Sequence, residues 1–520
     1  MSDAGHQPMR TPDGRYWITF NGEIYNYVEL REELKALGHT FHSQSDTEVL
    51  LAAYQRWGRE ALTRLIGMYA FAVLDRQRRT VLLARDCFGI KPLFYARWQE
   101  GLAFSSEIAP LLRLPGVSRN VHPQRLYDYL RSGLTDHSGE TLLAHIRQLP
   151  AAHVLEASLD DPHALTVERY WDLDRTKNLH ASFPEAAAQV RTLFLDSVRL
   201  HLRSDVPVGA ALSGGVDSSA IVSAMRRMDP TLDIHTFSYI AEDSRLSEER
   251  WVDVVTRAAG LHAHKIHISP TDIWADMERL IALQGEPFST TSMYAQWRVF
   301  QAARSAGIKV MLDGQGADEL LAGYPNYRLS RLSTLLRAGR FQEALTLAKI
   351  MATGGAGWTS ILRAALRMTP SWVQTMARRT LSRNATPAWM NLNWFRDREV
   401  GEVDVPPISG PRYLREDLYR TLTATSLPQL LRYEDRNSMA FSIESRVPFL
   451  TPALAQFLQS LPEEYLLSRD GTIKAVFRAA MRGIVPDAVL DRKDKVGCPT
   501  PERNWLLSQA SAVRRILTTD

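Results

Sequence analysis

The chain has very little cysteine, little net charge and no long apolar run. Its two cysteines, Cys87 and Cys498, stand far apart without metal-ligand spacing, which argues against a disulfide scaffold or a zinc site and fits a reducing compartment. A net charge of +4 over 520 residues does not indicate nucleic acid or an anionic membrane as a partner. No run approaches the roughly 18 apolar residues of a membrane-spanning helix, and the first residues lack a signal-peptide pattern. We expect a soluble cytoplasmic protein of two or three domains.

The most informative stretch is 206–219. An apolar run that ends at Leu212 is followed by the sequence SGGVDS (213–218) and then by a helical pattern. Strand, glycine-rich turn and helix start gather backbone N–H groups around an anion, and the two serine hydroxyls can donate to phosphate oxygens. Asp217 does not suit a bare phosphate, but a divalent cation between its carboxylate and the phosphates would explain it. The motif favours a nucleotide pyrophosphate site over the alternative, a plain turn with a helix cap.

A second glycine-rich loop with acidic residues, DGQGADE (313–319), follows another short apolar run. Strand candidates alternate with helical patterns, which predicts an α/β open parallel sheet with ligands at the carboxyl ends of its strands. The predicted strands are 206–212, 234–239, 262–268 and 310–312, and the predicted helices lie near 219–228, 248–260, 270–283 and 292–306. If the strand order brings the two loops together, Asp217 and Asp318 share Mg²⁺ against one triphosphate.

The first part of the chain reads as an α+β domain. Its motifs NGEIYNY (21–27), SDTEVLL (45–51) and RDCFGIKPLFY (85–95) resemble the glutamine amidotransferase domain of the glutamine-hydrolysing asparagine synthetases, an N-terminal nucleophile hydrolase fold. The resemblance implies that Asn21 and Gly22 form an oxyanion hole. It also implies that Glu23 and Asp46 hold the amino group of glutamine, although Asp46 can equally be a helix N-cap. Two alternating strands, 70–75 and 80–86, form a hairpin here, and 88–95 and 102–105 are expected to extend the same sheet.

This domain departs from the family in its nucleophile. In the family a cysteine follows the initiator methionine, and its own α-amino group takes the thiol proton. Here Ser2 follows Met1, and the segment after it resembles an interior part of the family, so the domain reads as incomplete. Cys87 stands where relatives carry arginine and is not a displaced nucleophile. As written, the chain is expected not to hydrolyse glutamine, whether through a wrong start codon, a fragment or genuine loss, and to have poorly covered sheet edges.

The second part, over 185–328 and 425–506, resembles the catalytic domain of the same asparagine synthetases, a pyrophosphatase-loop (adenine nucleotide alpha hydrolase-like) adenylating fold. The ATP-binding residues that this resemblance implies are Leu212, Ser213, Gly214, Gly215, Asp217, Ser218, Tyr239, Asp313 and Gly314. The implied catalytic residues are Lys474, Asp318, Arg446 and Gln315, and the implied Mg²⁺ ligands are Asp217 and Asp318. Without the resemblance, Lys474 would read as a solvated surface charge.

The second part differs from the family at two positions. Gln315 stands where many relatives have a glutamate implicated in forming the acyl-adenylate, and an amide cannot act as an acid or base. Thr451 replaces the aspartate that ends the family motif near 432–451. The segment 329–424 matches least, and its helical periodicity around 339–352 and 360–382 predicts a helical insertion that caps the active site, a membrane-surface role being the weaker alternative.

The sequence thus predicts an amidotransferase-like domain over 1–171 and an asparagine synthetase domain over 172–520. The predicted activity is ATP-dependent amide ligation: a carboxylate, by family precedent L-aspartate, is adenylated, and ammonia then displaces AMP. A non-catalytic nucleotide-binding homologue and a ring-closing or other ligase with a different acceptor remain alternatives. The expected partners are small molecules, without nucleic acid, and a homodimer stays open.

Overall fold

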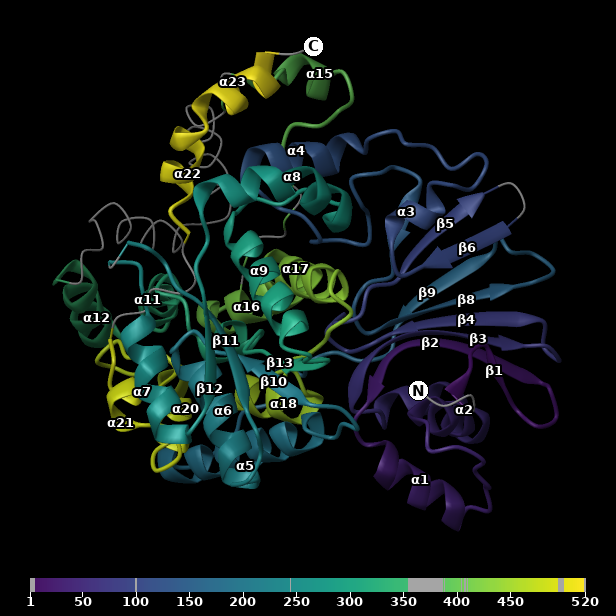
Figure 1. The fold of residues 1–520 in the computed structure, drawn as a ribbon, viewed down its shortest axis with the longest axis horizontal. Helices are drawn as coiled ribbons and strands as arrows, with labels where there is room; N and C mark the ends of the chain where they lie inside the picture. Colours follow the sequence, from purple (N-terminus) through teal and green to yellow (C-terminus); the bar gives the residue numbers. More distant parts are fainter. Residues whose placement is uncertain are drawn as a thin grey trace. The chain divides into compact units, whose positions relative to one another are not determined.

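The computed structural model describes residues 5–98, 101–243, 245–353, 387, 389–403, 405, 408, 410–493 and 500–518 (Figure 1). The chain forms two compact units. The first unit contains Met1–His180, Asp318–Leu431 and Thr451–Ala475, and the second contains Ala181–Ala317, Arg432–Leu450 and Val476–Asp520. The chain passes between the units within three helices, α10 (Ala317–Leu321), α17 (Leu427–Met439) and α20 (Ala475–Ala480), and in the loops after His180 and Leu450. Among the described residues, no helix has the length and apolar character needed to span a membrane.

The first unit contains a six-stranded antiparallel sheet in the order β1-β2-β3-β4-β8-β9. Its strands are Met9–Arg10, Tyr16–Ile24, Gly67–Asp75, Thr80–Arg85, His153–Ser158 and Leu165–Arg169. The predicted hairpin is confirmed as β3 and β4, whose paired residues include Asp75 and Thr80. Strand β2 runs further than predicted and includes Asn21 and Gly22, which pair with Ala70 and Tyr69 of β3.

The expectation that residues 88–95 and 102–105 extend this sheet is wrong, because 88–93 form no strand and 94–95 and 102–105 pair elsewhere. They belong to a separate three-stranded sheet, β6-β5-β7, formed by Gly101–Ser105, Phe94–Trp98 and Ile146–Gln148. A strand of either sheet would show the same alternation of apolar residues. In the structure, Leu83 and Leu155 of the large sheet pack with Tyr95 of the small sheet in a single buried cluster. The other face of the large sheet packs on helices α1 (Tyr27–Ala36) and α2 (Asp46–Trp57). The unit is therefore layered, with helices on one side and the second sheet on the other.

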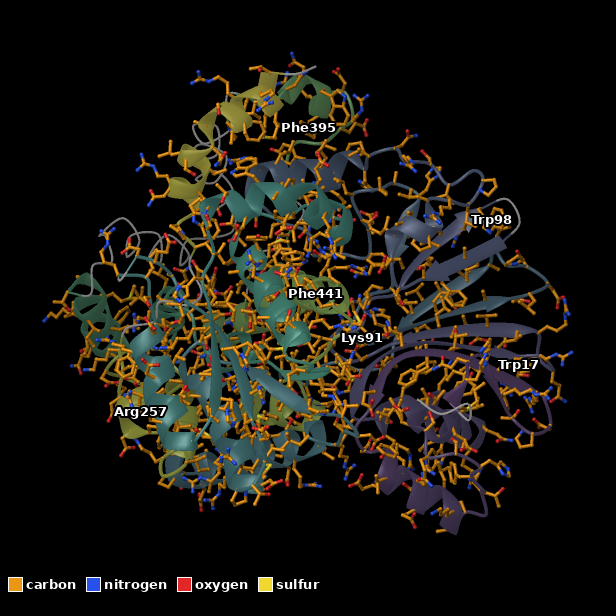
Figure 2. The ribbon with its side chains drawn as sticks, viewed as in Figure 1. Trp17, Lys91, Trp98, Arg257, Phe395 and Phe441 are labelled. Carbon is orange, nitrogen blue, oxygen red and sulfur yellow. The ribbon has the colours of Figure 1, made fainter. Side chains whose placement is uncertain are left out.

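The remaining helices of the first unit are short. They are α3 (Ile108–Leu111), α4 (Pro123–Ser132), α11 (Tyr327–Arg337), α12 (Phe341–Thr353), α15 (Leu392–Arg396), α16 (Tyr413–Arg420), α18 (Pro452–Ser460) and α19 (Glu463–Leu466), with a 3₁₀ turn at Gly58–Thr63 and a π turn at Thr421–Thr425. The helix expected around 339–352 is confirmed as α12, whereas 360–382 lies outside the described residues. Phe395, labelled in Figure 2, packs on Tyr127 of α4 with ring centroids 5.2 Å apart.

The second unit is built on a parallel sheet in the order β12-β11-β10-β13-β14, which confirms the predicted open parallel sheet. Its strands are His262–Ile266, His235–Tyr239, Val208–Ala211, Val310–Leu312 and Glu444–Arg446. The last strand was not predicted, because its three residues, two of them charged, carry no strand pattern. In the register, Leu312 pairs with Arg446 and Ala210 pairs with Leu312.

Helices α6 (Val216–Met228) and α9 (Ser292–Ser305) pack on this sheet (Figure 1). The other helices of the second unit are α5 (Phe183–His201), α7 (Glu249–Ala259), α8 (Pro270–Gln284), α20 (Ala475–Ala480), α21 (Asp487–Leu490), α22 (Glu502–Ser508) and α23 (Ala510–Thr518). Helix α5 begins with a capping box, in which Ser182 and Glu185 bond each other's backbone N–H groups. In the apolar layer, Phe441 (Figure 2) lies 4.9 Å from the ring centroid of Trp297.

One buried histidine makes the second unit sensitive to acid. His201, at the end of α5, is fully buried, and this burial lowers its pKa from 6.5 to about 3. The folded chain therefore keeps it neutral, while the unfolded chain protonates it below about pH 6.5, so its contribution to stability is lost as pH falls from there toward 3.

We expect the free energy of unfolding to fall by about 2 kcal/mol between pH 7 and pH 5 through this group. Denaturant midpoints measured at several pH values test this, and His201→Gln should flatten the dependence. His262→Gln, whose side chain is 69% exposed, serves as the control and should leave it unchanged. An equal slope in wild type and His201→Gln would contradict the assignment.

Candidate active site

The loop between β10 and α6 forms a cradle of N–H groups and hydroxyls. The N-cap of α6 is Gly215, which offers no side-chain acceptor, so the first N–H groups of the helix keep no cap partner. Ser218 Oγ accepts a hydrogen bond from Ser213 N at 3.2 Å and lies 3.1 Å from Ser213 Oγ. Ser213 Oγ in turn accepts from Gly215 N at 3.3 Å. These bonds hold the loop open around the helix end, which is the arrangement that binds phosphate.

Gly214 is required by space as well as by backbone conformation. Its φ is +74°, and a Cβ atom there would lie 2.6 Å from Trp251 Cβ and 2.9 Å from Val252 N. Arg492 fixes the same point from the other side: its guanidinium donates to Gly214 O at 2.9 Å and to Glu248 Oε1 at 2.7 Å. Arg492 is not among the predicted site residues, because the partner of this contact lies 278 residues away in the chain.

The condition for a shared nucleotide site is met within the second unit. Strands β10 and β13 are neighbours, and a Cβ on Gly314 would lie 3.3 Å from Asp217 Cβ, so the two glycine-rich loops touch. Leu212, which is 1% exposed, ends the strand below the first loop, and Tyr239 ends the next strand of the sheet. These positions lie at the carboxyl ends of the strands, where open α/β sheets bind ligands.

Asp217 is the carboxylate nearest the cradle. Burial lowers the pKa of the Arg478 guanidinium, and the charge of Asp217 opposes that change. The described residues contain no cluster of three or more His, Cys, Asp or Glu side chains arranged to hold a metal.

A buried carboxyl pair lies under the second loop. Glu434 of α17 is 3% exposed and hydrogen-bonds to Asp313, and burial raises the pKa of both carboxyls, that of Glu434 further because of the charge of Asp313. Glu434 Oε2 accepts from Gln315 Nε2 at 3.3 Å. Glu434 also accepts hydrogen bonds from Ser445 and Gln296. Sequence reasoning missed Glu434 because its partners come from three separate segments of the chain.

Within the first unit, Lys474 and Asp318 form a tight ion pair, with Nζ 2.5 Å from Oδ1. Lys474 is 3% exposed, so the alternative of a solvated surface charge is wrong. The pair leaves no room at Gly323, where a Cβ atom would lie 1.8 Å from Asp318 Oδ1 and 2.3 Å from Lys474 Cε. The lysine neutralises a carboxylate that was also predicted to bind Mg²⁺, and both of those roles stay predictions.

Arg446 is buried, at 2% exposure, and its guanidinium is occupied by the protein itself. It donates to His201 O at 2.7 Å and Arg203 O at 2.6 Å, and its Nε donates to Glu444 Oε1 at 2.6 Å. The backbone carbonyl of Arg446 accepts from Asp313 N at 2.8 Å. The side chain thus ties β14 to the end of α5, and its main chain helps to place the second loop. Its catalytic role stays a prediction.

The predicted glutamine site occupies the end of β2 in the first unit. Asn21 Nδ2 donates to Ser106 Oγ at 3.2 Å, and Gly22, with φ +145°, would carry a Cβ atom 2.0 Å from Met68 O. The N-cap of α2 is Ser45, so the N-cap alternative for Asp46 is wrong; Asp46 Oδ2 instead accepts from Ile24 N at 3.0 Å. This bond brings the Asp46 carboxylate beside the residue that follows Glu23.

Cys87 has the properties of an inert core thiol. Burial raises its pKa to about 12, and its Sγ atom lies 3.8 Å from Tyr170 Oη. A thiol with this pKa carries almost no thiolate at neutral pH. The structure therefore agrees with the prediction that Cys87 is not a displaced nucleophile.

Comparison with known proteins shows which families match this chain. Residues 189–520 match the asparagine synthase family model, and residues 1–171 match that of the glutamine amidotransferase domain. Glutamine-hydrolysing asparagine synthetase 1 of Bacillus subtilis is 33% identical, covering 99% of this chain and 80% of its own length. Asparagine synthetase 3 of the same organism is 31% identical, with 94% and 77% covered. A putative asparagine synthetase of Mycobacterium tuberculosis H37Rv is 33% identical, with 96% and 78% covered.

Among solved structures, the allosteric regulatory enzyme of purine biosynthesis aligns over 60% of this chain and 58% of its own, at 14% identity and a TM-score of 0.24.

Proposed function

The chain belongs to the asparagine synthase family and is a carbon–nitrogen ligase of the glutamine-dependent class, and from this premise we propose that it makes asparagine. In the proposed reaction, L-aspartate is adenylated by MgATP with release of pyrophosphate, and ammonia converts the adenylate to the amide and AMP. The proposed substrates are thus all small molecules, and the proposed site of action is the cytoplasm.

The contact between the two glycine-rich loops carries this proposal. The first loop offers N–H groups and two hydroxyls at a helix N-terminus, and the second meets it at Asp217. A phosphate chain that occupies the cradle places its next phosphorus toward the second loop, where an acceptor carboxylate can approach. Because both loops are fixed by neighbouring strands of one sheet, the geometry is set before the substrate arrives.

The proposed chemistry has two displacements. A carboxylate oxygen of aspartate forms a bond to the α-phosphorus as the bond to pyrophosphate breaks. Ammonia nitrogen then bonds to the acyl carbon, one proton leaves the nitrogen, and the carbon–oxygen bond to AMP breaks. Negative charge grows on phosphate oxygens in both steps, and the Lys474 ammonium is the buried cation that we assign to it. Mg²⁺ would be held by Asp217 and would neutralise phosphate charge there, and metal binding by Asp318 stays a prediction.

Aspartate-dependent exchange of labelled pyrophosphate into ATP tests the first displacement, and asparagine formation from ammonium tests the second. We expect both, with AMP and asparagine in equal amounts. Exchange with another carboxylic acid but not with aspartate would show that the other acid is the acceptor substrate. ATP binding without any exchange would favour a non-catalytic homologue. The same assay with glutamine in place of ammonium shows whether the chain uses glutamine as its nitrogen source.

A further inference from the structure

A pocket of about 450 Å³ opens at the amino ends of the parallel strands of the second unit. Its lining includes Val208 and His235, the first residues of β10 and β11, and Ile308, two residues before β13. A Cβ atom on Gly307, which also lines the pocket, would meet nothing within 4 Å. The two glycine-rich loops follow the carboxyl ends of β10 and β13, so this pocket lies at the opposite edge of the sheet. Its volume is within the range of small-molecule sites.

The pocket combines an apolar wall with negative charge. The wall is formed by Leu202, Val206, Pro207, Leu232 and Ala306. Two aspartates also line the pocket, and none of its described lining residues is a lysine or an arginine. A site with this lining attracts positive charge and offers contacts to hydrocarbon.

One of the two aspartates, Asp229, stays ionised near neutral pH. Hydrogen bonds from the Thr231 hydroxyl and backbone N–H lower the pKa of its carboxyl. Arg226 acts on Asp229 through its charge, but its guanidinium donates to three backbone carbonyls, those of Ala259, Pro230 and Gly260. The nearby arginine is therefore directed to the main chain and does not close the pocket.

The other aspartate, Asp233, is held by imidazoles. Its Oδ2 lies 3.4 Å from His235 Nε2, and its Oδ1 lies 3.2 Å from His262 Nε2. His235 Nδ1 lies 2.9 Å from His264 Nε2. Burial, followed by the charges of His235 and His262, lowers the pKa of His264. One tautomer of each ring satisfies these contacts: His264 donates to His235 Nδ1, and His235 Nε2–H donates to Asp233. Both rings are then neutral, so they orient the carboxylate without cancelling its charge.

We propose that this pocket binds a small organic cation, an alkylammonium or arylammonium ion, whose charged group pairs with Asp233 and whose hydrocarbon part covers the apolar wall. A carboxylate has about four lone-pair positions, and the two neighbouring imidazoles occupy at most two of them, so acceptor positions remain for an ammonium group. An organic anion would be repelled by Asp229 and Asp233, and inorganic ammonium would leave the apolar wall uncovered. The inference goes beyond the proposed reaction, because the pocket and the phosphate cradle lie at opposite edges of the sheet.

Phenethylammonium is the probe for this site. 2-Phenylethanol and 3-phenylpropionate keep the aromatic ring and replace the positive charge by no charge and by a negative charge. NMR titration of the whole enzyme at pH 8, above the ordinary titration range of imidazole, gives the three affinities. Since Asp233 is 70% exposed, we expect the ammonium to bind about fivefold more tightly than the alcohol, and the carboxylate to bind most weakly. Equal affinities for the ammonium and the alcohol, or no binding of the ammonium, would overturn the proposal.

Asp233→Asn keeps the shape of the side chain and removes its charge. It should weaken phenethylammonium binding about fivefold and leave the affinity for 2-phenylethanol unchanged. Asp196→Asn is the matched control, since Asp196 is a 59% exposed carboxylate on α5 that does not line the pocket. It should bind the ammonium within about twofold of the wild type, and equal losses in the two variants would show an effect of net charge only and overturn the proposal.

Val206→Arg is a second variant in case Asp233→Asn does not fold. Val206 is 42% exposed, so the fold tolerates a long side chain there, and the added guanidinium lies at the pocket wall. It should weaken binding of the ammonium more than binding of the alcohol. Unchanged ammonium affinity in Val206→Arg would place the probe elsewhere on the protein and overturn the assignment of this pocket.

Discussion

Replacing Lys474 by methionine is expected to lower the rate of aspartate-dependent pyrophosphate exchange by about 100-fold or more. Methionine keeps an unbranched apolar side chain in the buried site and removes the ammonium group. Lys474 is 3% exposed, so water cannot substitute freely for its charge when phosphate charge develops. The loss should appear in the turnover rate more than in the KM for aspartate, because the lysine is assigned to charge that grows during the displacement.

Arg469→Met is the matched control for this experiment. Arg469 precedes Lys474 by five residues and is also a cation, but its side chain is 74% exposed and meets Glu343 at 3.4 Å. Exposed pairs of this kind contribute little, so the exchange rate should stay within about twofold of the wild type. A Lys474→Met enzyme as active as the Arg469→Met enzyme would contradict the role of Lys474.

Lys474→Met also leaves Asp318 without the cation that lies 2.5 Å from it. Adding Asp318→Asn removes the unpaired charge, so the double variant should recover thermal stability that the single variant loses. It should not recover exchange, because the cation is still missing. Recovery of exchange in the double variant would mean that the lysine acts only by stabilising the fold.

The parts of the fold that the sequence predicted depend on neighbouring residues. The strand–turn–helix pattern at 206–219 was read from glycines and a periodic apolar pattern, and β10, its loop and α6 lie there. Contact between the two loops could be stated only as a condition, because β13 lies beside β10 although two other strands separate them along the chain. The errors arose where local pattern was not enough. Residues 94–95 alternate as a strand should, but only packing decides which sheet receives them.

The parts of the site that sequence missed depend on partners distant in the chain. Arg492 reaches Gly214 across 278 residues, and Glu434 reaches Gln315 across 119. In sequence, each is one more charged residue in a polar stretch. Asp46 shows the opposite case, since Ser45 takes the helix cap and thereby frees Asp46 to bond the end of β2. When two adjacent polar residues precede a helix, the sequence alone does not show which of them is the N-cap.

Gly214→Ala is expected to abolish detectable ATP binding and to destabilise the second unit. Alanine at φ +74° costs about 1–2 kcal/mol in backbone strain alone. Its Cβ would further lie 2.6 Å from Trp251 Cβ and 2.9 Å from Val252 N, and since the latter is backbone, no side-chain rotation relieves the clash. The loop must move, and the N–H groups at the start of α6 then lose the arrangement that phosphate requires.

Gly260→Ala separates backbone strain from steric clash. Gly260 ends α7 with φ +59°, and a Cβ atom there meets nothing within 4 Å, so this variant carries the conformational cost without the collision. We expect it to lose about 1 kcal/mol of stability and to bind ATP as the wild type does. Titration with a fluorescent ATP analogue, at a temperature where all three proteins are folded, makes the comparison. Equal ATP affinity in Gly214→Ala and Gly260→Ala would show that the close approach of the loop to Trp251 is not what shapes the phosphate cradle.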